Sequence, residues 1–259
     1  MKRDFIDTIL AEYSPISLAE MEGVRLMNRV DIKYAVSSAR LSELLKRLQS
    51  AYLVQEINGS RSNAYRTLYL DTDDRAMYIA HHNGCLTREK IRVRTYFDSQ
   101  SIYLEVKHKN NRGRTQKKRL ELSEMTAYKQ EKAETFLKTY AKYRPETLLP
   151  RLENSFHRIT LVNKQKTERL TIDLNLTFRS PTPTGEEKKL NDLAIIELKQ
   201  QQHQPSFAKS VLSELHIHPL AISKYCLGTI LTVPNVKNNL FKEKIIQINK
   251  IRENQYGFV

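Results

Sequence analysis

The chain has 259 residues, of which 40% are hydrophobic, and a formal net charge of +14 at pH 7. This length allows one large domain or two small ones with a sizeable core. No stretch reaches the roughly 20 consecutive apolar residues that a membrane helix needs, and the first residues lack a signal-peptide core. Cys85 and Cys226 match no zinc or redox spacing. We therefore expect a cytoplasmic protein with reduced thiols.

The first half of the chain alternates between predicted helices and strands. Apolar spacing predicts helices over 2–13 and 16–27, a strand over 29–36, a helix over 38–50, a strand over 65–71 and a short helix over 75–82. Three strands then follow closely, at 88–97, 101–109 and 115–122. This short spacing is typical of an antiparallel meander.

The second half begins with an amphipathic helix, which we expect over 123–143. Strands are predicted at 156–163, 168–175 and 193–199, and helices at 206–216, 222–232 and 239–250. Two prolines and a glycine interrupt the stretch 179–190, which we expect to be a surface loop. Antiparallel strands with added helices predict an α+β fold built on one large sheet or barrel.

Charged residues alternate with apolar ones in the predicted strands, most clearly in Lys90-Ile-Arg92-Val-Arg94. Alternate side chains of a strand point to opposite faces, so each strand has one charged face and one apolar face. Between Arg88 and Arg119 lie eleven Lys and Arg residues and three acidic ones. Such a field attracts nucleic acid, anionic membranes or phosphorylated small molecules. A solubilising face is the plainer alternative, but solubilising charge usually lies on loops and helix exteriors.

The apolar face of the strands also bears on the architecture. If the helices cover it, the charged face must line a shared, wet interior. A barrel with an apolar interior would instead leave the helices little to pack against. We favour the charged interior.

Several familiar catalytic motifs are missing from the sequence. It has no Gly-x-x-x-x-Gly-Lys-Ser/Thr loop, no His-Glu-x-x-His motif and no nucleophile elbow. The close histidine pairs, His81-His82 and His216-x-His218, lack a second cluster of ligands, so we interpret them as surface or structural histidines and not as metal ligands. An enzyme of this composition would depend on positioned cations and a metal ion, as phosphoryl transfer does.

Eight motifs occur in an order that resembles the VTC domain. They are Arg29-x-Asp31-x-Lys33-Tyr34, Tyr69-Leu-Asp71-Thr72, Lys90-Ile-Arg92-x-Arg94, Leu104-Glu105-x-Lys107, Arg158, Arg169-x-Thr-Ile-Asp173, Glu197-x-Lys199 and Ser223-Lys224-Tyr225. The resemblance spans about residues 25 to 230. The VTC domain is part of the triphosphate tunnel metalloenzyme superfamily and is the catalytic part of the eukaryotic polyphosphate polymerase.

The resemblance implies an eight-stranded antiparallel β-barrel tunnel with a charged lumen and helices packed outside. It implies a single domain over 1–259, with N-terminal helices in 1–27, the tunnel core in 28–232 and a C-terminal helix and tail in 233–259. Such a tunnel is too narrow for duplex nucleic acid.

The resemblance also implies roles for individual residues. Catalysis would fall to Lys33, Arg92, Arg94 and Lys224. Phosphate binding would involve Lys33, Lys90, Arg92, Arg94, Lys107, Lys117, Arg119, Arg158, Arg169, Ser223, Lys224 and Tyr225. Glu197 would hold a divalent metal, Mn²⁺ or Mg²⁺. Glu105 and Asp173 would either join the metal shell or orient neighbouring lysines and arginines.

Two positions depart from related patterns. The CYTH branch, with adenylate cyclases and thiamine triphosphatases, carries Glu-x-Glu-x-Lys on the first strand, where this chain has Arg29 and Asp31. The lost carboxylate argues against cyclase or two-metal hydrolase chemistry. Phe156 stands where relatives often have a tyrosine, which removes one hydroxyl contact to phosphate.

We expect a metal-dependent enzyme that transfers the γ-phosphate of ATP to a polyphosphate chain. Hydrolysis of inorganic triphosphate and non-catalytic sensing of a phosphorylated ligand remain open alternatives. Nucleic-acid binding is less favoured, because the chain lacks basic patches interleaved with aromatic residues. The eukaryotic relatives work beside membrane subunits, so the resemblance allows a separate membrane-protein partner and a position at the inner membrane face.

Overall fold

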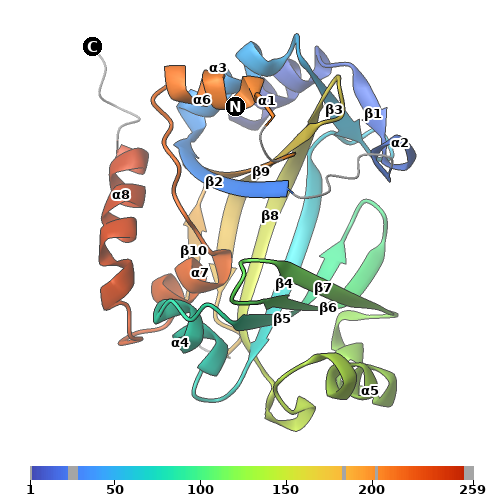
Figure 1. Cartoon of the computed structure of the whole chain (residues 1–259), viewed down its shortest axis with the longest axis vertical. Helices are drawn as coiled ribbons and strands as arrows, with labels where there is room; N and C mark the ends of the chain where they lie inside the picture. Colours follow the sequence, from blue (N-terminus) through green and yellow to red (C-terminus); the bar gives the residue numbers. More distant parts are fainter. Residues whose placement is uncertain (1, 23–28, 183–184, 202–203, 254–259) are drawn as a thin grey trace.

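Figure 1 presents a computed structural model of the chain, which describes residues 2–22, 29–182, 185–201 and 204–253. The helices are α1 (Lys2–Ala11), α2 (Leu18–Glu22), α3 (Ser38–Leu48), α4 (Ala76–His82), α5 (Glu131–Tyr140), α6 (Phe207–Glu214), α7 (Lys224–Thr232) and α8 (Lys242–Glu253). Short 3-10 helices span Met125–Lys129, Pro145–Thr147 and Asn239–Phe241. The strands are β1 (Pro15–Ser17), β2 (Arg29–Ser37), β3 (Tyr52–Glu56), β4 (Asn63–Asp71), β5 (Arg88–Tyr96), β6 (Ser101–Lys109), β7 (Thr115–Leu122), β8 (Leu149–Asn163), β9 (Glu168–Arg179), β10 (Glu187–Leu190) and β11 (Leu193–Gln201).

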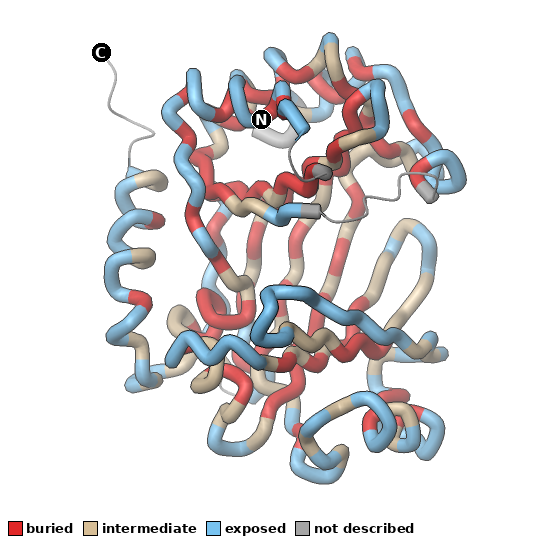
Figure 2. Tube along the Cα trace, in the orientation of Figure 1, coloured by how far each residue is buried: buried red, intermediate tan, exposed pale blue. Residues whose placement is uncertain are grey.

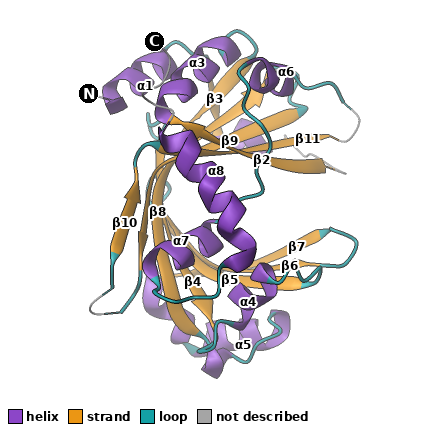
Figure 3. Cartoon of the chain, turned by 90° about the vertical axis from the view of Figure 1, so that its left-hand side faces the viewer, coloured by secondary structure: helices purple, strands orange, loops and turns teal. Residues whose placement is uncertain are grey.

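The eight strands predicted from the sequence form the main path of one sheet, in the order β2-β11-β9-β8-β4-β5-β6-β7. All neighbours on this path are antiparallel. Figure 3 shows the sheet strongly curved, with β2, β9 and β11 on one side of its concave face and β5, β6 and β7 on the other. Within the described residues β2 and β7 do not pair, so hydrogen bonds do not close the sheet into a complete barrel. The predicted α+β fold on a large antiparallel sheet is confirmed.

Helices cover the convex face, where the apolar side chains of the strands lie. Leu41, Leu44 and Leu45 of α3 pack with Ile172 and Ile196 in one cluster that also includes α1 and α6. A second cluster joins the apolar positions of β5 and β6 to α5 and the 3-10 helix before it; it includes Ile91, Val93, Leu104, Val106, Tyr128 and Leu137. The charged residues therefore point to the concave face. Our prediction of a charged interior is confirmed.

One helix differs from the rest in its position. Tyr225 and Leu227 of α7 pack with Phe156 and Ile195, which share the concave side of their strands with the charged residues. Helix α7 therefore fills one end of the concave face, and its first residues lie beside the charged region. Among the described residues no helix has the length and apolar character of a membrane span.

Two helix predictions were wrong in part. Residues 15–17 form β1, which pairs in parallel with β3, and Ser17 and Glu20 then form a capping box that begins α2. Residues 23–27 of that predicted helix lie outside the described part of the chain. The helix predicted over 123–143 is interrupted by the extended backbone of Gln130, which separates a 3-10 helix from α5.

The sheet extends beyond the predicted strands. β8 begins at Leu149, β9 continues to Arg179, and β3 and β10 were missed. β10 pairs with the end of β9, so the predicted loop 179–190 is wrong over its last four residues. The division into N-terminal helices, core and tail stays a prediction.

Candidate functional site

Strand register brings oppositely charged side chains next to each other across the concave face. Lys33 lies opposite Glu197, and Arg158 lies opposite Asp173. Arg92 faces Glu105 in the same way. Direct cross-strand neighbours on one face have Cβ atoms about 5 Å apart, which explains why the charges form three compact clusters.

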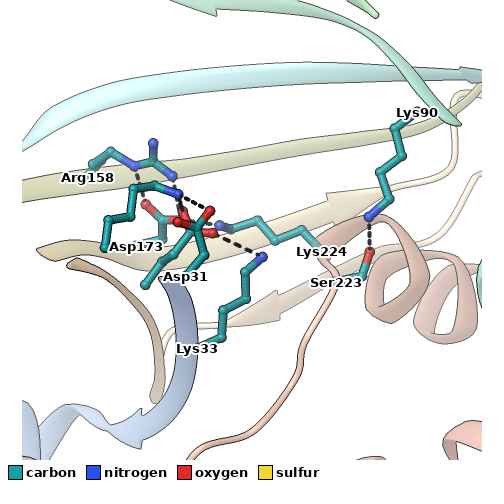
Figure 4. Close-up of polar contacts among 9 residues, drawn as sticks. Asp31, Lys33, Lys90, Arg158, Asp173, Ser223 and Lys224 are labelled. Atoms are coloured by element: carbon teal, nitrogen blue, oxygen red, sulfur yellow. Dashed lines mark hydrogen bonds and ion pairs between the residues drawn. The ribbon is translucent and has the colours of Figure 1, made fainter. Parts of the chain in front are cut away.

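The most buried cluster is Arg158, Asp173 and Lys224. Arg158 donates from Nε and Nη2 to the two carboxylate oxygens of Asp173, at 2.6 and 2.8 Å. Lys224, at the start of α7, contacts the same carboxylate (Figure 4). Burial alone would raise the pKa of Asp173, but Arg158 and Lys224 outweigh it and lower the pKa to about 2. The carboxylate therefore stays ionised and fixes the position of both cations.

A second cluster lies at the junction of β2 and β11. The Lys199 ammonium contacts Asp31 at 2.7 Å and Glu197 at 3.0 Å, and Lys33 lies 3.5 Å from the other oxygen of Glu197. Burial opposes ionisation of Glu197, yet Lys33 and Lys199 hold its pKa below the usual range. The backbone of Lys33 is held by the segment before α7, because Leu220 donates its backbone N–H to the Lys33 carbonyl at 2.7 Å.

The third cluster joins β5, β6 and β7 around Glu105, whose side chain is 1% exposed. Arg92 and Lys117 donate to separate oxygens of this carboxylate, at 2.7 and 2.8 Å. Burial raises the pKa of Glu105, but Arg92, Arg94 and Lys117 reverse the effect and keep it below its usual range. The three clusters share one design, in which a buried or half-buried carboxylate holds two cations.

Three further predicted phosphate ligands, Lys90, Arg94 and Lys107, have no carboxylate within 4 Å of their side-chain nitrogens among the described residues. Lys90 donates to Ser223 at 3.0 Å (Figure 4), and Arg94 donates to Thr67 at 3.1 Å. Burial is the main cause that lowers the pKa of Lys90 to about 7 and of Lys107 to about 8. These lysines gain the most from an incoming anion, because it would replace the solvation that they lack.

An aromatic surface lies beneath the cations. Phe156 and Tyr65 stack with centroids 5.2 Å apart. The Lys224 ammonium lies 4.5 Å from the Phe156 ring centroid, and the Arg158 guanidinium lies 5.3 Å from it. Cations over aromatic faces are attracted by the ring quadrupole, so the Phe156 ring supports both cations.

The remaining predicted residues are placed differently. Lys117 and Arg119 are on the exposed strand β7, which Figure 2 shows in pale blue, and Arg119 lies over Tyr103 at 4.7 Å. Arg169 is half-buried opposite Lys199. The Tyr225 hydroxyl donates to Asp71 at 2.6 Å in the core, so it does not point to the clusters.

Three residues of the site were not among our predictions. Lys199 links two carboxylates, Thr67 fixes Arg94, and Tyr65 lies beneath Arg158. Lys199 has the same parity as Glu197, which was a usable signal. Thr67 and Tyr65 gave no such signal in the sequence, because their importance depends on strand β4 lying between β5 and β8.

The carboxylates differ in their fitness for a divalent ion. Glu105 and Asp173 are held closely by strong cation partners, which favours the orienting role that the sequence left open. Glu197 makes longer contacts and shares the Lys199 ammonium with Asp31, so one cation already contacts two carboxylates there. Mg²⁺ commonly takes one or two protein carboxylates and completes its shell with water and phosphate oxygens. Glu197, with Asp31 beside it, fits such an ion.

An ion held by protein side chains alone is not supported. No three His, Cys, Asp or Glu residues of the described part of the chain gather as a metal site. A divalent ion here would therefore depend on phosphate oxygens for much of its coordination.

Comparison with known proteins places these features in a family. The family model for the VTC domain matches residues 28–233. A candidate adenylate cyclase from Bacillus halodurans has a similar structure, with a TM-score of 0.50, 16% identity and coverage of 76% of this chain and 96% of that one. A second solved structure is a candidate adenylyl cyclase from Hippeastrum, described as having a dominant triphosphatase activity. Its TM-score is 0.47 at 15% identity, with coverage of 81% of this chain and 98% of that one.

At these identities the similarity to solved structures concerns the fold alone. No curated protein matches the sequence. The family match, in contrast, covers well over half of the chain and includes all three charged clusters. The chain belongs to the VTC domain family.

Proposed function

We propose that this protein transfers the γ-phosphate of ATP to the end of an inorganic polyphosphate chain. The observation that carries the proposal is the convergence of cations from several strands and α7 on one concave face, each cluster fixed by a buried carboxylate. Positioned cations of this kind bind phosphate oxygens and stabilise the charge that develops during phosphoryl transfer.

The residues divide the work by position. Arg158 and Lys224 would bind phosphate oxygens on one side of the polyphosphate chain. Arg92 and Arg94 would bind phosphate oxygens on its opposite side. Arginine favours this role because its planar fork matches two phosphate oxygens at once. Phosphate oxygens would compete with Asp173 and Glu105 for the same donors. Before phosphate binds, these carboxylates keep the cations in position.

A divalent ion, Mn²⁺ or Mg²⁺, would be held by Glu197 together with phosphate oxygens and would neutralise charge on the transferred group. Lys33 and Lys199 would keep Glu197 ionised at neutral pH, since they lower its pKa. One metal-holding carboxylate pair, in place of several, favours transfer between phosphate groups over two-metal hydrolysis of triphosphate.

Non-catalytic binding is the second candidate. It is favoured by the fact that cations already contact Asp31, Glu105, Asp173 and Glu197 in this structure, an arrangement that can hold a phosphate chain without a catalytic metal ion. A sensor of triphosphate or polyphosphate would bind its ligand tightly and turn nothing over.

One experiment separates these functions. Purified protein is incubated with ATP, Mn²⁺ and a short polyphosphate primer, and chain length and orthophosphate are both measured. Chain growth that depends on Glu197 supports the polymerase. Orthophosphate without growth identifies a hydrolase, and tight binding with neither product identifies a sensor. No growth in the wild type, or unchanged growth in Glu197→Ala, overturns the proposal.

A further inference from the structure

A cavity of about 660 Å³ lies at the end of the concave face where β2, the start of β5 and the hairpin β6–β7 meet α8. We refer to it as the mouth cavity. Its cationic lining consists of Lys33, Arg88, Lys90, Lys107, Lys109 and Lys244. Lys33, Lys90 and Lys107 also belong to the predicted phosphate site, so the cavity continues that site toward the outside.

Most of the charges in the mouth cavity are not neutralised by the protein; Lys33, which contacts Glu197, is the exception. Within the described residues, no carboxylate lies within 4 Å of the side-chain nitrogens of Arg88, Lys109 or Lys244. Arg88 donates instead to the Cys85 carbonyl at 2.8 Å. Asp31 is the one acidic residue in the lining, and it contacts Lys199. An anion in this cavity would therefore meet cations without having to displace a carboxylate.

The ring of His81 reports how closely these cations converge. Its pKa is lowered to about 2, mainly by burial and also by Lys90, Arg88 and Lys244. These three cations come from β5 and α8, which are far apart in sequence, and they line the same cavity as His81. The positive field is therefore concentrated in the cavity.

Helix α8 supplies a part of the cavity that lies outside the family match, which ends at residue 233. Ile248 anchors α8 in the core at 3% exposure, and Lys244 lies 5.6 Å from the Phe241 ring centroid. Lys244 is thus held at the rim by packed structure. Lys244 thus adds to the rim a cation from beyond residue 233, where the family match ends.

We propose that the mouth cavity is a second anion subsite, which holds the phosphate units of a chain that is too long for the central clusters. This inference rests on the proposed function, because it assumes that the central clusters hold a phosphate chain. Each phosphate unit that reaches the cavity would contact cations that have no carboxylate partner. The protein would therefore bind long-chain polyphosphate more tightly than triphosphate, and the difference would shrink with added salt.

The test uses a variant that changes the rim and leaves the central clusters intact. Lys109→Ala/Lys244→Ala is compared with Lys118→Ala/Lys242→Ala, which removes the same charge from exposed positions on β7 and α8. Dissociation constants are measured by calorimetry for inorganic tripolyphosphate and for long-chain inorganic polyphosphate. We expect the rim variant to lose about five- to tenfold in affinity for the long chain, as two screened charge contacts would give, and to keep its affinity for tripolyphosphate within about twofold.

Several results would overturn the inference. They are equal losses for both ligands, no loss for either, or the same loss in the control variant. A wild type that binds both ligands without length preference overturns the inference and leaves the proposed function standing. Length-dependent binding without chain growth leaves the subsite standing and overturns the polymerase.

Discussion

The central clusters and the mouth cavity are both strongly basic, but they hold their charges differently. In the centre, Asp173, Glu105 and Glu197 each contact two cations and fix their positions. At the mouth, Arg88, Lys109 and Lys244 have no such partner within the described residues. Paired cations are preorganised and suit chemistry that needs geometry. Unpaired cations attract an anion but do not orient it, which suits a part of the ligand that is bound and does not react.

Removing the carboxylate proposed to hold metal would have the largest effect. In Glu197→Gln we expect chain growth to fall at least ~100-fold, because a neutral amide is a poor ligand for a divalent ion. Growth is followed by gel electrophoresis of the products. Glu186→Gln, which alters an exposed ion pair with Lys188, is the control and should retain full activity. Equal rates of chain growth in Glu197→Gln and wild type would contradict the proposal that Glu197 holds a metal ion needed for the reaction.

Breaking the most buried cluster would affect stability more than binding. Asp173→Asn leaves Arg158 and Lys224 without their carboxylate, and removal of one partner of a buried pair costs about 3–5 kcal/mol. We expect a clear drop in melting temperature and recovery when tripolyphosphate is added, because phosphate oxygens replace the carboxylate. Glu187→Gln, in an exposed pair with Lys189, should change little. A destabilised variant that the ligand fails to rescue would contradict the exchange of partners.

The same cluster predicts a pH dependence of stability. The pKa of Asp173 is lowered from 3.8 to about 2, so its ionised form stabilises the fold above the unfolded pKa. This contribution is lost as pH falls from about 4 toward 2. Urea unfolding across this range should show a loss of stability that is smaller in Asp173→Asn. Parallel curves for the two proteins would argue against the assignment.

Replacing the aromatic surface tests how the central cations are supported. Phe156→Leu removes the ring beneath Lys224 and Arg158. Two partly desolvated cation–π contacts correspond to about tenfold in affinity for tripolyphosphate. Phe156→Tyr keeps the ring and should bind at least as well as wild type. If leucine and tyrosine give the same affinity, measured by calorimetry, the ring has no role in holding the cations.

The smallest expected effect concerns Lys90, which joins the two regions. Its pKa of about 7 means that it is charged below neutral pH and loses its charge as pH rises through 7. Affinity for tripolyphosphate should therefore fall by about threefold between pH 6 and 8, relative to Lys90→Arg, which stays charged. The ratio of the two proteins cancels the ionisation of the ligand itself. A constant ratio would show that Lys90 is charged throughout.

Local alternation predicted the concave face well, because the two-residue period of a strand is a strictly local property. Lys90, Arg92 and Arg94 lie on one face, with Ile91 and Val93 on the other, as expected. Asp71, the last residue of β4, contacts the start of helix α4, which begins at Ala76. Its carboxylate accepts the backbone N–H groups of Met77 and Tyr78.

Partners across the sheet could not be predicted, since they depend on the order of the strands. The contacts of Lys199 with Asp31 and Glu197 arise because β11 lies beside β2. Strand β3 was missed because Tyr52-Leu-Val-Gln-Glu is short and lacks regular alternation. The mouth cavity depends on α8, whose place against the sheet follows from long-range packing of Ile248.

A crystal structure of the protein with tripolyphosphate and Mn²⁺ tests the central claim most directly. We predict phosphate groups on the concave face, in contact with Arg158, Lys224, Arg92 and Arg94, and a metal ion that bridges Glu197 and phosphate oxygens. Asp173 should then share its cations with the ligand. Phosphate bound only outside the concave face, or a metal ion away from Glu197, would contradict the account.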